Sequence, residues 1–337
     1  IMTQPIFFML MNIAGMSIYW VAAHLISSGS LEIGQLVAFM DYLFHAMFSI
    51  MLFCTVFMMY PRAEVSAKRI QEVFNLEPSI KNDPVDDKSN DEVSIEFDHV
   101  TFAYPDGEEP VLYDVSFKAK KGEVVAFIGS TGSGKSTLVN LIPRFYNVSK
   151  GRIKINEKDI RDYDVLQLRD KLGVIPQKAV LFSGSIADNI RFGKKDATDE
   201  EVIHAAKVAQ AYSFIMDKEN GFNELISEGA TNVSGGQKQR LSIARALVRK
   251  AQIYIFDDSF SALDFKTDAV LRKELKKEMS ESIMLVVAQR ISSIMDADQI
   301  IVLNEGKVVG QGTHHQLLKE CQIYYEIATS QLSEEEL

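Results

Sequence analysis

Hydrophobic residues are arranged along this chain in two different ways. Residues 5–26 and 36–60 form two long, almost uninterrupted apolar runs, and the first 60 residues contain no Lys or Arg. Each run exceeds the roughly 20 residues that cross the hydrocarbon core of a bilayer. From residue 92 onward the apolar runs are short and separated by polar segments, which predicts buried strands alternating with helices.

The two apolar runs and the turn-rich loop between them, residues 27–34, predict a transmembrane hairpin. A pair of buried helices in a soluble protein is the alternative. The loop carries no basic residue, whereas Arg62, Lys68 and Arg69 closely follow the second run. By the positive-inside rule, the second helix ends on the cytoplasmic side of the cell membrane, and the rest of the chain follows it there.

The pattern divides the chain into three parts. Residues 1–60 hold the membrane helices, and residues 61–91 form a helical extension followed by a polar linker with Pro78 and Pro84. Residues 92–337 form an α/β domain, with a helical insertion at about 179–250. The strands we expect in this domain are 93–97, 111–117, 123–128, 174–176, 253–256, 283–287 and a hairpin over 299–309.

One stretch of the α/β domain has the spacing Gly-x4-Gly-Lys-Ser/Thr, between a predicted strand and a helix over 136–145. In that context glycines let the backbone approach phosphate oxygens, and the N–H groups at the helix start face the anion. Lys135 would neutralise the β- and γ-phosphates, and Ser136 would bind Mg²⁺ through its hydroxyl. An ordinary Gly-Ser turn is the alternative. This phosphate loop comprises Gly129, Ser130, Thr131, Gly132, Ser133, Gly134, Lys135, Ser136 and Thr137.

A second candidate anion site opens the predicted helix 237–249. Ser234 and Gln237 have capping-box spacing, and the N–H groups of Ser234, Gly235 and Gly236 would be free to bind an anion. One nucleotide does not easily fill two such sites within one compact subunit. A head-to-tail dimer would solve this, with each signature segment (residues 234–237) covering the nucleotide of the other subunit. A plain capped helix is the alternative.

In the order of its motifs the chain resembles the ATP-binding-cassette (ABC) transporters, of the exporter type that joins membrane helices to a nucleotide-binding domain. The resemblance covers essentially the whole chain. It implies a helical transmembrane hairpin followed by an α/β P-loop ATPase domain with an inserted helical subdomain, and ATP and Mg²⁺ as cofactors. The motifs are Phe102-Ala-Tyr104-Pro, the phosphate loop, Ile175-Pro-Gln177, Ser234-Gly-Gly-Gln237, Ile253-Tyr-Ile-Phe-Asp257-Asp258, Ser261-Ala-Leu-Asp264 and Val287-Ala-Gln289-Arg290.

The resemblance also implies a role for each matching residue. Tyr104 would stack on adenine, while Gln177 would reach Mg²⁺ and the attacking water. Asp257 would hold Mg²⁺ together with Ser136. Ser261 and Asp264 would lie at the dimer interface with the signature segment. The catalytic set that the resemblance implies is Lys135, Gln177, Asp258 and Gln289.

Two residues depart from the pattern of the family. Asp258 stands where the general base is usually Glu, and Gln289 stands where the switch residue is usually His. The shorter carboxylate would fall short of the water by roughly 1 Å, and misplacement on that scale can cost about a hundredfold in rate. Gln289 can hydrogen-bond a γ-phosphate but cannot become a cation. Both changes spare nucleotide binding and weaken bond cleavage.

The signature segment, by contrast, keeps the residues of the family. This asymmetry resembles the degenerate-site subunit of a heterodimeric exporter, whose partner would be a second exporter half in the bilayer. A homodimeric exporter with ordinary ATPase activity is the alternative, followed by a non-transport ABC ATPase. The exported drug, lipid or peptide is not specified by the sequence. A net charge of −10 argues against nucleic acid as a partner.

An exporter half of this family carries six transmembrane helices before the nucleotide-binding domain. The two apolar runs match the last pair. We therefore expect the chain to be the C-terminal part of a longer polypeptide, which also agrees with its first residue not being Met.

Overall fold

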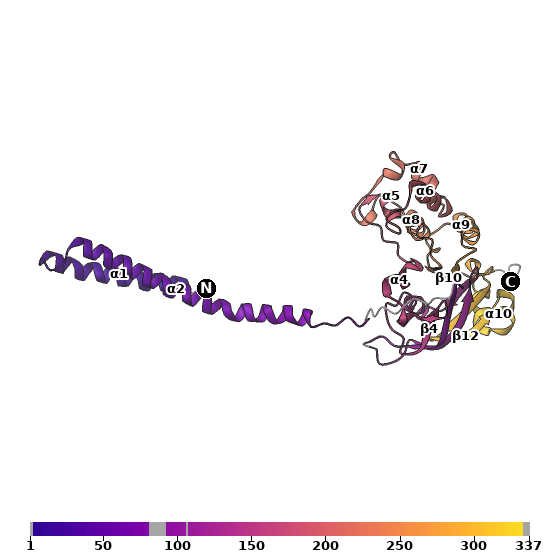
Figure 1. Cartoon of the computed structure of the whole chain (residues 1–337), viewed down its shortest axis with the longest axis horizontal. Coiled ribbons are helices and arrows are strands. Elements are labelled where there is room, and N and C mark those ends of the chain that lie inside the picture. The colour runs from indigo at the N-terminus through magenta and orange to yellow at the C-terminus, as the bar shows by residue number, and fades with distance from the viewer. Residues whose placement is uncertain (1–2, 81–91, 106, 333–337) are drawn as a thin grey trace. The chain divides into compact units, whose positions relative to one another are not determined.

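The computed structural model of the chain describes residues 3–80, 92–105 and 107–332, and they fall into two units (Figure 1). The first unit ends at Ser79 and the second begins at Ile80. Most of the predicted linker, residues 81–91, and the last five residues of the predicted α/β domain lie outside the described residues.

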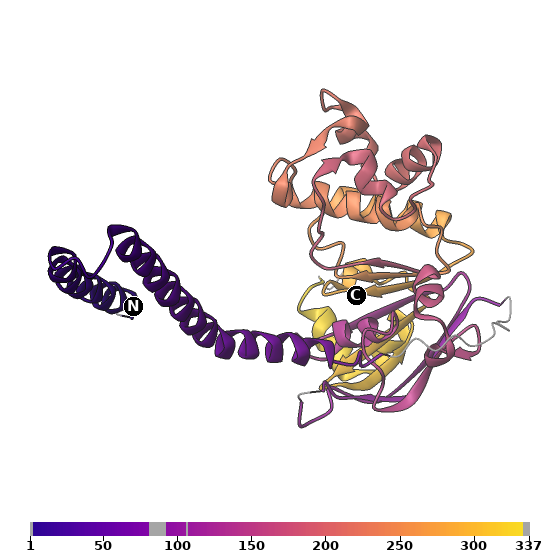
Figure 2. The same ribbon diagram turned by 60° about the vertical axis from the view of Figure 1, so that its left-hand side comes forward.

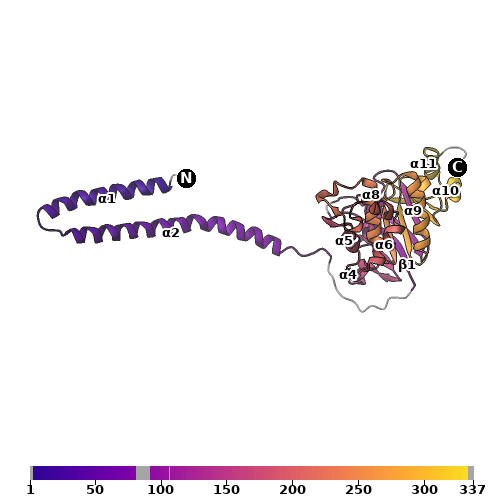
Figure 3. The ribbon, with the colours of Figure 1, turned by 90° about the horizontal axis from the view of Figure 1, so that it is seen from above.

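The N-terminal unit is a hairpin of two long helices, α1 (Thr3–Ser27) and α2 (Ile33–Phe74), which lie side by side (Figure 3). Both helices are long and apolar enough to cross a membrane. Most of their apolar side chains are not covered by other parts of this chain. Glu32 and Gln35 form a capping box that begins α2. This helix continues through Pro61, so the predicted apolar run and its cytoplasmic extension form one continuous helix.

The second unit is built on two sheets. A four-stranded antiparallel sheet has the order β2-β1-β4-β5, and a six-stranded sheet has the order β12-β11-β3-β10-β9-β6. In the larger sheet β3, β6, β9, β10 and β11 are parallel, and β12 joins the edge antiparallel to β11. The strands are β1 (Ser94–Phe102), β2 (Leu112–Lys120), β3 (Val124–Gly129), β4 (Lys150–Ile155), β5 (Lys158–Asp159), β6 (Leu172–Ile175), β9 (Ile253–Asp257), β10 (Ile283–Val287), β11 (Gln299–Asn304) and β12 (Lys307–Gly312).

The uninterrupted apolar sequences of β3, β9 and β10 explain their central place, since strands covered on both faces are apolar at every position. One face of the larger sheet packs against the antiparallel sheet, with Phe97, Phe117 and Phe127 in contact across the layer. The opposite face packs against helices. These are α8 (Gly235–Leu247), α9 (Phe265–Glu278), α10 (His314–Glu320) and α11 (Gln322–Thr329).

A helical subdomain lies to one side of the sheets in Figure 2 and is joined to the larger sheet through α8. It comprises α5 (Ile186–Arg191), α6 (Asp199–Val208), α7 (Tyr212–Met216) and α8, together with the short hairpin of β7 (Gly184–Ser185) and β8 (Leu225–Ile226). Capping boxes begin α5, α6 and α8, at Ser185, Thr198 and Ser234. Each uses a hydroxyl and a side chain three residues later to satisfy N–H groups that the helix leaves free.

The predicted strands are confirmed, with ends that differ by a few residues. The prediction of a helix over 136–145 is wrong at its end, because α3 spans only Lys135–Leu141. Pro143 has no N–H to continue the helical hydrogen bonds, and Arg144 adopts a φ of 53°, which is outside the right-handed helical region.

The contact between α5 and α8 is tight enough to test. A Cβ atom at Gly193, just after α5, would lie 1.9 Å from the carbonyl oxygen of Arg245 in α8. We expect Gly193→Ala to lower the free energy of unfolding by about 1–3 kcal/mol, the usual effect of overpacking a well-packed contact. Thermal unfolding of the full-length protein in detergent measures the change.

Lys195→Ala is the matched control, since Lys195 is exposed two residues further along the same turn. We expect its effect to stay within about 0.5 kcal/mol, as is usual for surface positions. A Gly193→Ala protein as stable as the control would contradict the packing described here.

Candidate functional site

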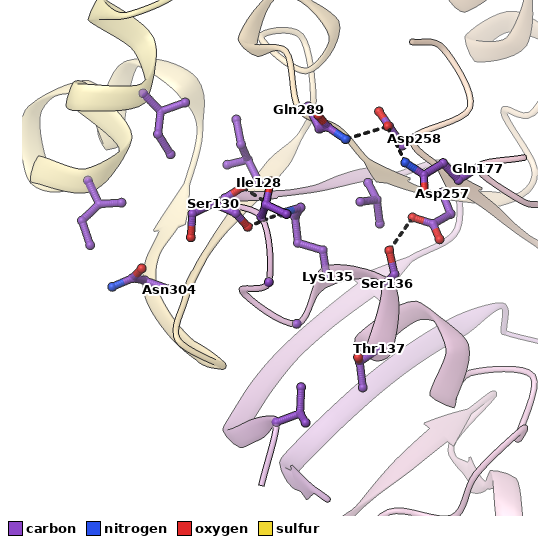
Figure 4. Close-up of a pocket in the computed structure, with 18 of the residues that line it drawn as sticks. Ile128, Ser130, Lys135, Ser136, Thr137, Gln177, Asp257, Asp258, Gln289 and Asn304 are labelled. Atoms are coloured by element: carbon purple, nitrogen blue, oxygen red, sulfur yellow. Dashed lines mark hydrogen bonds between the residues drawn. The ribbon is translucent and has the colours of Figure 1, made fainter. Parts of the chain in front are cut away.

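A cavity of about 630 Å³ lies at the carboxyl ends of the parallel strands β3, β9 and β10 (Figure 4). Open parallel sheets commonly bind ligands at this edge, because the strand-to-helix loops converge there. The residues of the predicted site that line the cavity are Gly129, Ser130, Thr131, Gly132, Gly134, Lys135, Ser136, Thr137, Gln177, Asp257, Asp258 and Gln289.

The phosphate loop runs from the end of β3 into the start of α3, and two of its glycines are required by close contacts. A Cβ at Gly129 would lie 2.0 Å from the carbonyl oxygen of Leu303, and one at Gly134 would lie 2.7 Å from Leu112 Cδ2. Both glycines also have left-handed φ values, 155° and 97°, that other residues rarely adopt. The loop is therefore held tightly against the ends of neighbouring strands.

Lys135 points back into the loop and is almost fully buried. Its Nζ donates to the carbonyl oxygens of Gly129 (2.8 Å) and Ser130 (2.7 Å), and to Ser133 Oγ (3.3 Å). Burial lowers the pKa of this ammonium, and the nearby Asp258 and Asp257 carboxylates partly offset that effect. The site thus holds a poorly hydrated cation inside a ring of backbone atoms, which suits a phosphate anion.

Ser136 and Asp257 lie together at the opposite side of the loop. Ser136 Oγ donates to Asp257 Oδ1 at 3.1 Å. Burial raises the pKa of the Asp257 carboxyl, while the hydrogen bond from Ser136 acts in the opposite direction. A hydroxyl and a carboxylate at this distance offer the oxygen ligands that Mg²⁺ prefers.

Asp258 follows directly after β9 and is buried, with a φ of 48°. This left-handed conformation is one that Asp and Asn tolerate better than most residues. A single carboxylate oxygen, Asp258 Oδ2, accepts hydrogen bonds from Gln289 Nε2 (2.7 Å) and Gln177 Nε2 (3.1 Å). Figure 4 shows both amides pointing at this carboxylate from two different loops.

Tyr104 does not line the cavity but lies beside it. Its ring packs edge-on against Phe102 and Tyr146, with centroids 4.9 and 5.1 Å away, and its hydroxyl hydrogen-bonds Thr137 Oγ1 at 3.1 Å. Ser133 is also absent from the lining, because it is buried beneath the loop.

The signature segment begins α8 and does not line the cavity of its own chain. The prediction that the Ser234 N–H is free is wrong, because it donates to Gln237 Oε1 at 3.0 Å within the capping box. The N–H groups of Gly235 and Gly236 lie in the first turn of α8, ahead of its i→i−4 hydrogen bonds.

Ser261 and Asp264 follow β9 and hold local structure. Ser261 Oγ donates to the carbonyl oxygen of Asp258 at 2.9 Å, and Asp264 caps α9 by accepting from the N–H of Thr267 at 3.0 Å. Neither lines the large cavity.

The structure adds lining residues that the motifs did not predict. Asn304 comes from the end of β11, and one face of α11 closes the side of the cavity near Gln289. The lining residues from this C-terminal region are Ile323, Glu326, Ile327, Ser330 and Gln331. The sequence of α11 indicates an amphipathic helix and gives no sign of which neighbour it covers.

The chain is similar in sequence to proteins of one family. Residues 112–261 match the family described as ABC transporter. The chain is 41% identical over 334 residues to YfiB, an uncharacterized ABC transporter ATP-binding protein of Bacillus subtilis (strain 168), covering 99% of this chain and 58% of that protein. It is 38% identical over 302 residues to a putative multidrug export ATP-binding/permease protein of Staphylococcus aureus (strain NCTC 8325), covering 88% of this chain and 52% of that protein.

A solved structure is similar over nearly the whole chain. It is described as a bacterial Atm1-family ABC exporter with ATP bound, and it matches with a TM-score of 0.85 and 31% sequence identity. The match covers 97% of this chain and 58% of that chain, so this chain spans little more than half the length of the relatives it matches. The chain is therefore a member of the ABC transporter family and a membrane protein in which two membrane-length helices precede a cytoplasmic ATP-binding domain.

Proposed function

We propose that this chain belongs to one half of an ABC exporter in which two nucleotide sites have different tasks. ATP at the phosphate loop of this chain would be held firmly and hydrolysed slowly. The signature segment of this chain would complete the site of a second, different exporter half, where hydrolysis is fast.

The observation that carries this proposal is the environment of Asp258. Its side chain is one methylene shorter than Glu, and a shortfall of roughly 1 Å at a reacting water can cost about a hundredfold in rate. One of its two carboxylate oxygens, Oδ2, accepts hydrogen bonds from Gln177 and Gln289. These two bonds hold the short side chain in its present position, away from a more distant water.

Gln289 supports the same conclusion. A neutral amide can donate one hydrogen bond to a γ-phosphate, but it adds no positive charge to the charge that develops as the phosphoryl group transfers. The loss concerns the transition state more than the bound nucleotide. Binding depends on the phosphate loop and Lys135, whose geometry is intact.

The signature segment supports the second half of the proposal. Gly235 and Gly236 present N–H groups at the start of a 13-residue helix, where the helix dipole favours an anion. The segment does not line the cavity of its own chain, so its anion would come from another subunit. We infer that Ser261 and Asp264 contribute to the same subunit contact.

Mg²⁺ is the cation that we expect beside the nucleotide. No group of three or more His, Cys, Asp or Glu gathers among the described residues to enclose a metal ion. Ser136 and Asp257, with Gln177 nearby, suit an ion that keeps most of its ligands as phosphate oxygens and water. Bound Mg²⁺ would neutralise the charge of the β- and γ-phosphates, while Lys135 binds the same oxygens from the other side.

The cargo that we propose is a drug, a lipid or a peptide. The S. aureus relative is described as a putative multidrug export protein, which supports drug-like molecules among these classes. Closing two nucleotide-binding domains around ATP would change the arrangement of the membrane helices, and hydrolysis at the faster site would reset them. Tyr104 would contact the adenine after a change in its packing against Tyr146.

The first test compares ATP turnover of the full-length protein alone and together with its partner half. We expect slow turnover alone and fast turnover in the pair. In the protein alone, the double change Asp258→Glu with Gln289→His should raise turnover by about tenfold to a hundredfold, because it restores the reach and the charge that the site lacks. Release of phosphate measures the rate.

Gly235→Asp provides the opposite control, since a carboxylate at the signature segment would repel the nucleotide of the partner. We expect it to abolish turnover of the pair without changing nucleotide binding by the protein alone. Brisk turnover by the unmodified protein alone, lost in Asp258→Asn, would refute the proposal.

A second test addresses the metal. We expect Asp257→Asn to remove the increase in affinity that Mg²⁺ gives to a fluorescent ATP analogue, because the amide cannot neutralise the cation. Binding is titrated with Mg²⁺ or with EDTA. Since burial raises the pKa of Asp257, acidification should also weaken the Mg²⁺ effect in the unmodified protein.

Asp217→Asn is the matched control, since Asp217 is exposed and does not line the cavity. An Mg²⁺ effect that survives Asp257→Asn at full size would show that the ion binds elsewhere.

A further inference from the structure

The switch segment, residues 288–291, carries Gln289 away from the edge of the larger sheet. Its last bond to the sheet is made by Ala288, whose N–H donates to the carbonyl oxygen of Phe127 at 3.1 Å. Beyond it, β10 has ended and only a three-residue helical turn, η4 (Ile291–Ser293), follows. The backbone hydrogen bonds of β10 to its neighbouring strand therefore end before Gln289.

Gln331, near the C-terminal end of the described chain, bonds this backbone beyond β10. Its Nε2 donates to the carbonyl oxygen of Gln289 at 2.9 Å, and its Oε1 accepts from the N–H of Ile291 at 2.9 Å. In a parallel sheet, one residue of a strand bonds two groups of the neighbouring strand: the C=O of one residue and the N–H of the residue two positions later. The Gln331 side chain bonds the same two backbone groups. The amide of Gln331 thus holds the backbone around Arg290 extended, with a φ of −109° and a ψ of 128°.

The position of Gln331 is fixed by the packing of α11. Tyr324 and Ala328 are fully buried, and the Tyr324 hydroxyl hydrogen-bonds His314 Nδ1 of α10 at 2.7 Å. Gln331 lies two residues past the end of α11, where its backbone N–H donates to the carbonyl oxygen of Ala328 at 3.0 Å and so ties it to that helix. Gln331 also accompanies Gln289 in the lining of the nucleotide cavity.

We propose that Gln331 is a positioning residue of the nucleotide site, which acts through the backbone of Gln289 rather than on the nucleotide. By fixing that backbone it sets the place from which the Gln289 side chain bonds Asp258, and from which it would bond the γ-phosphate of bound ATP. This inference rests on the proposed function in taking Gln289 as the residue that senses the γ-phosphate.

Hydrogen exchange and nucleotide release in Gln331→Leu test this role in the full-length protein purified with its partner half. The Ile291 amide loses its acceptor, so we expect its hydrogen exchange to become about fivefold to tenfold faster. A ribose-labelled fluorescent ATP analogue with Mg²⁺ should leave this site about fivefold faster. The corresponding ADP analogue should leave at an unchanged rate, because it has no γ-phosphate for Gln289 to bond.

Two further variants separate positioning from a merely structural role. Gln322→Leu makes the same change at the start of α11, at a side chain that bonds only Glu326 among the contacts the structure describes, and we expect no effect on any of the three rates. Gln331→Glu keeps an acceptor for Ile291 but cannot donate to Gln289. Its ATP analogue should leave faster than from the unmodified protein, and less so than from Gln331→Leu.

Unchanged exchange at Ile291 in Gln331→Leu would overturn the inference, as would faster exchange without faster release of the ATP analogue. Equal acceleration of the ATP and ADP analogues would also overturn it, since that pattern indicates general loosening. The proposed function fails by a different result, brisk turnover of the unmodified protein alone. The ratio of ATP to ADP analogue release can be read in either case.

Discussion

One carboxylate oxygen connects two of the loops that surround this nucleotide site. Asp258 Oδ2 accepts hydrogen bonds from Gln177, which follows β6, and from Gln289, which follows β10. The phosphate loop lies beside it, and its Lys135 experiences the charges of Asp258 and Asp257. Three loops from three parallel strands thus meet at one buried acid. A charge at such a point has a large effect, since the surrounding protein screens it less than water would.

The sheet explains why these loops meet. β3, β9 and β10 are adjacent and parallel, so Gly129, Asp257 and Val287 end at the same edge. Their side chains are buried in the core on both faces, which leaves little freedom in where each strand ends. The close contact of Gly129 with Leu303 fixes the loop to the fourth strand of this group, β11. The strand ends and the phosphate loop, which form the base of the site, are therefore rigid.

The strands and the phosphate loop at the base of the site could be predicted well from the sequence. The contacts among the residues around the cavity could not. Short apolar runs identify buried strands, and the Gly-Lys-Ser spacing identifies a phosphate loop, because each feature depends on residues close together in the chain. The contact of Gln331 with Gln289 joins residues 42 positions apart through side-chain and backbone atoms, and no local pattern encodes it. The short α3 is a different case, because Pro143 is a local signal for the end of the helix that the prediction over 136–145 overlooked.

The base of the site and the residues around it are held in different ways, so they can diverge independently. The strand ends and the phosphate loop are held by core packing and by backbone contacts that tolerate almost no change. We therefore expect nucleotide binding to persist when other residues of the site change. Asp258 and Gln289, which we propose act on the γ-phosphate, are held by a few hydrogen bonds each, at the ends of loops. Because a single bond of this kind is modest in energy, Asp258 and Gln289 can differ from the usual residues while the fold and the phosphate loop stay intact. The slow hydrolysis proposed for this site is thus a change that the architecture accommodates while the phosphate loop stays intact.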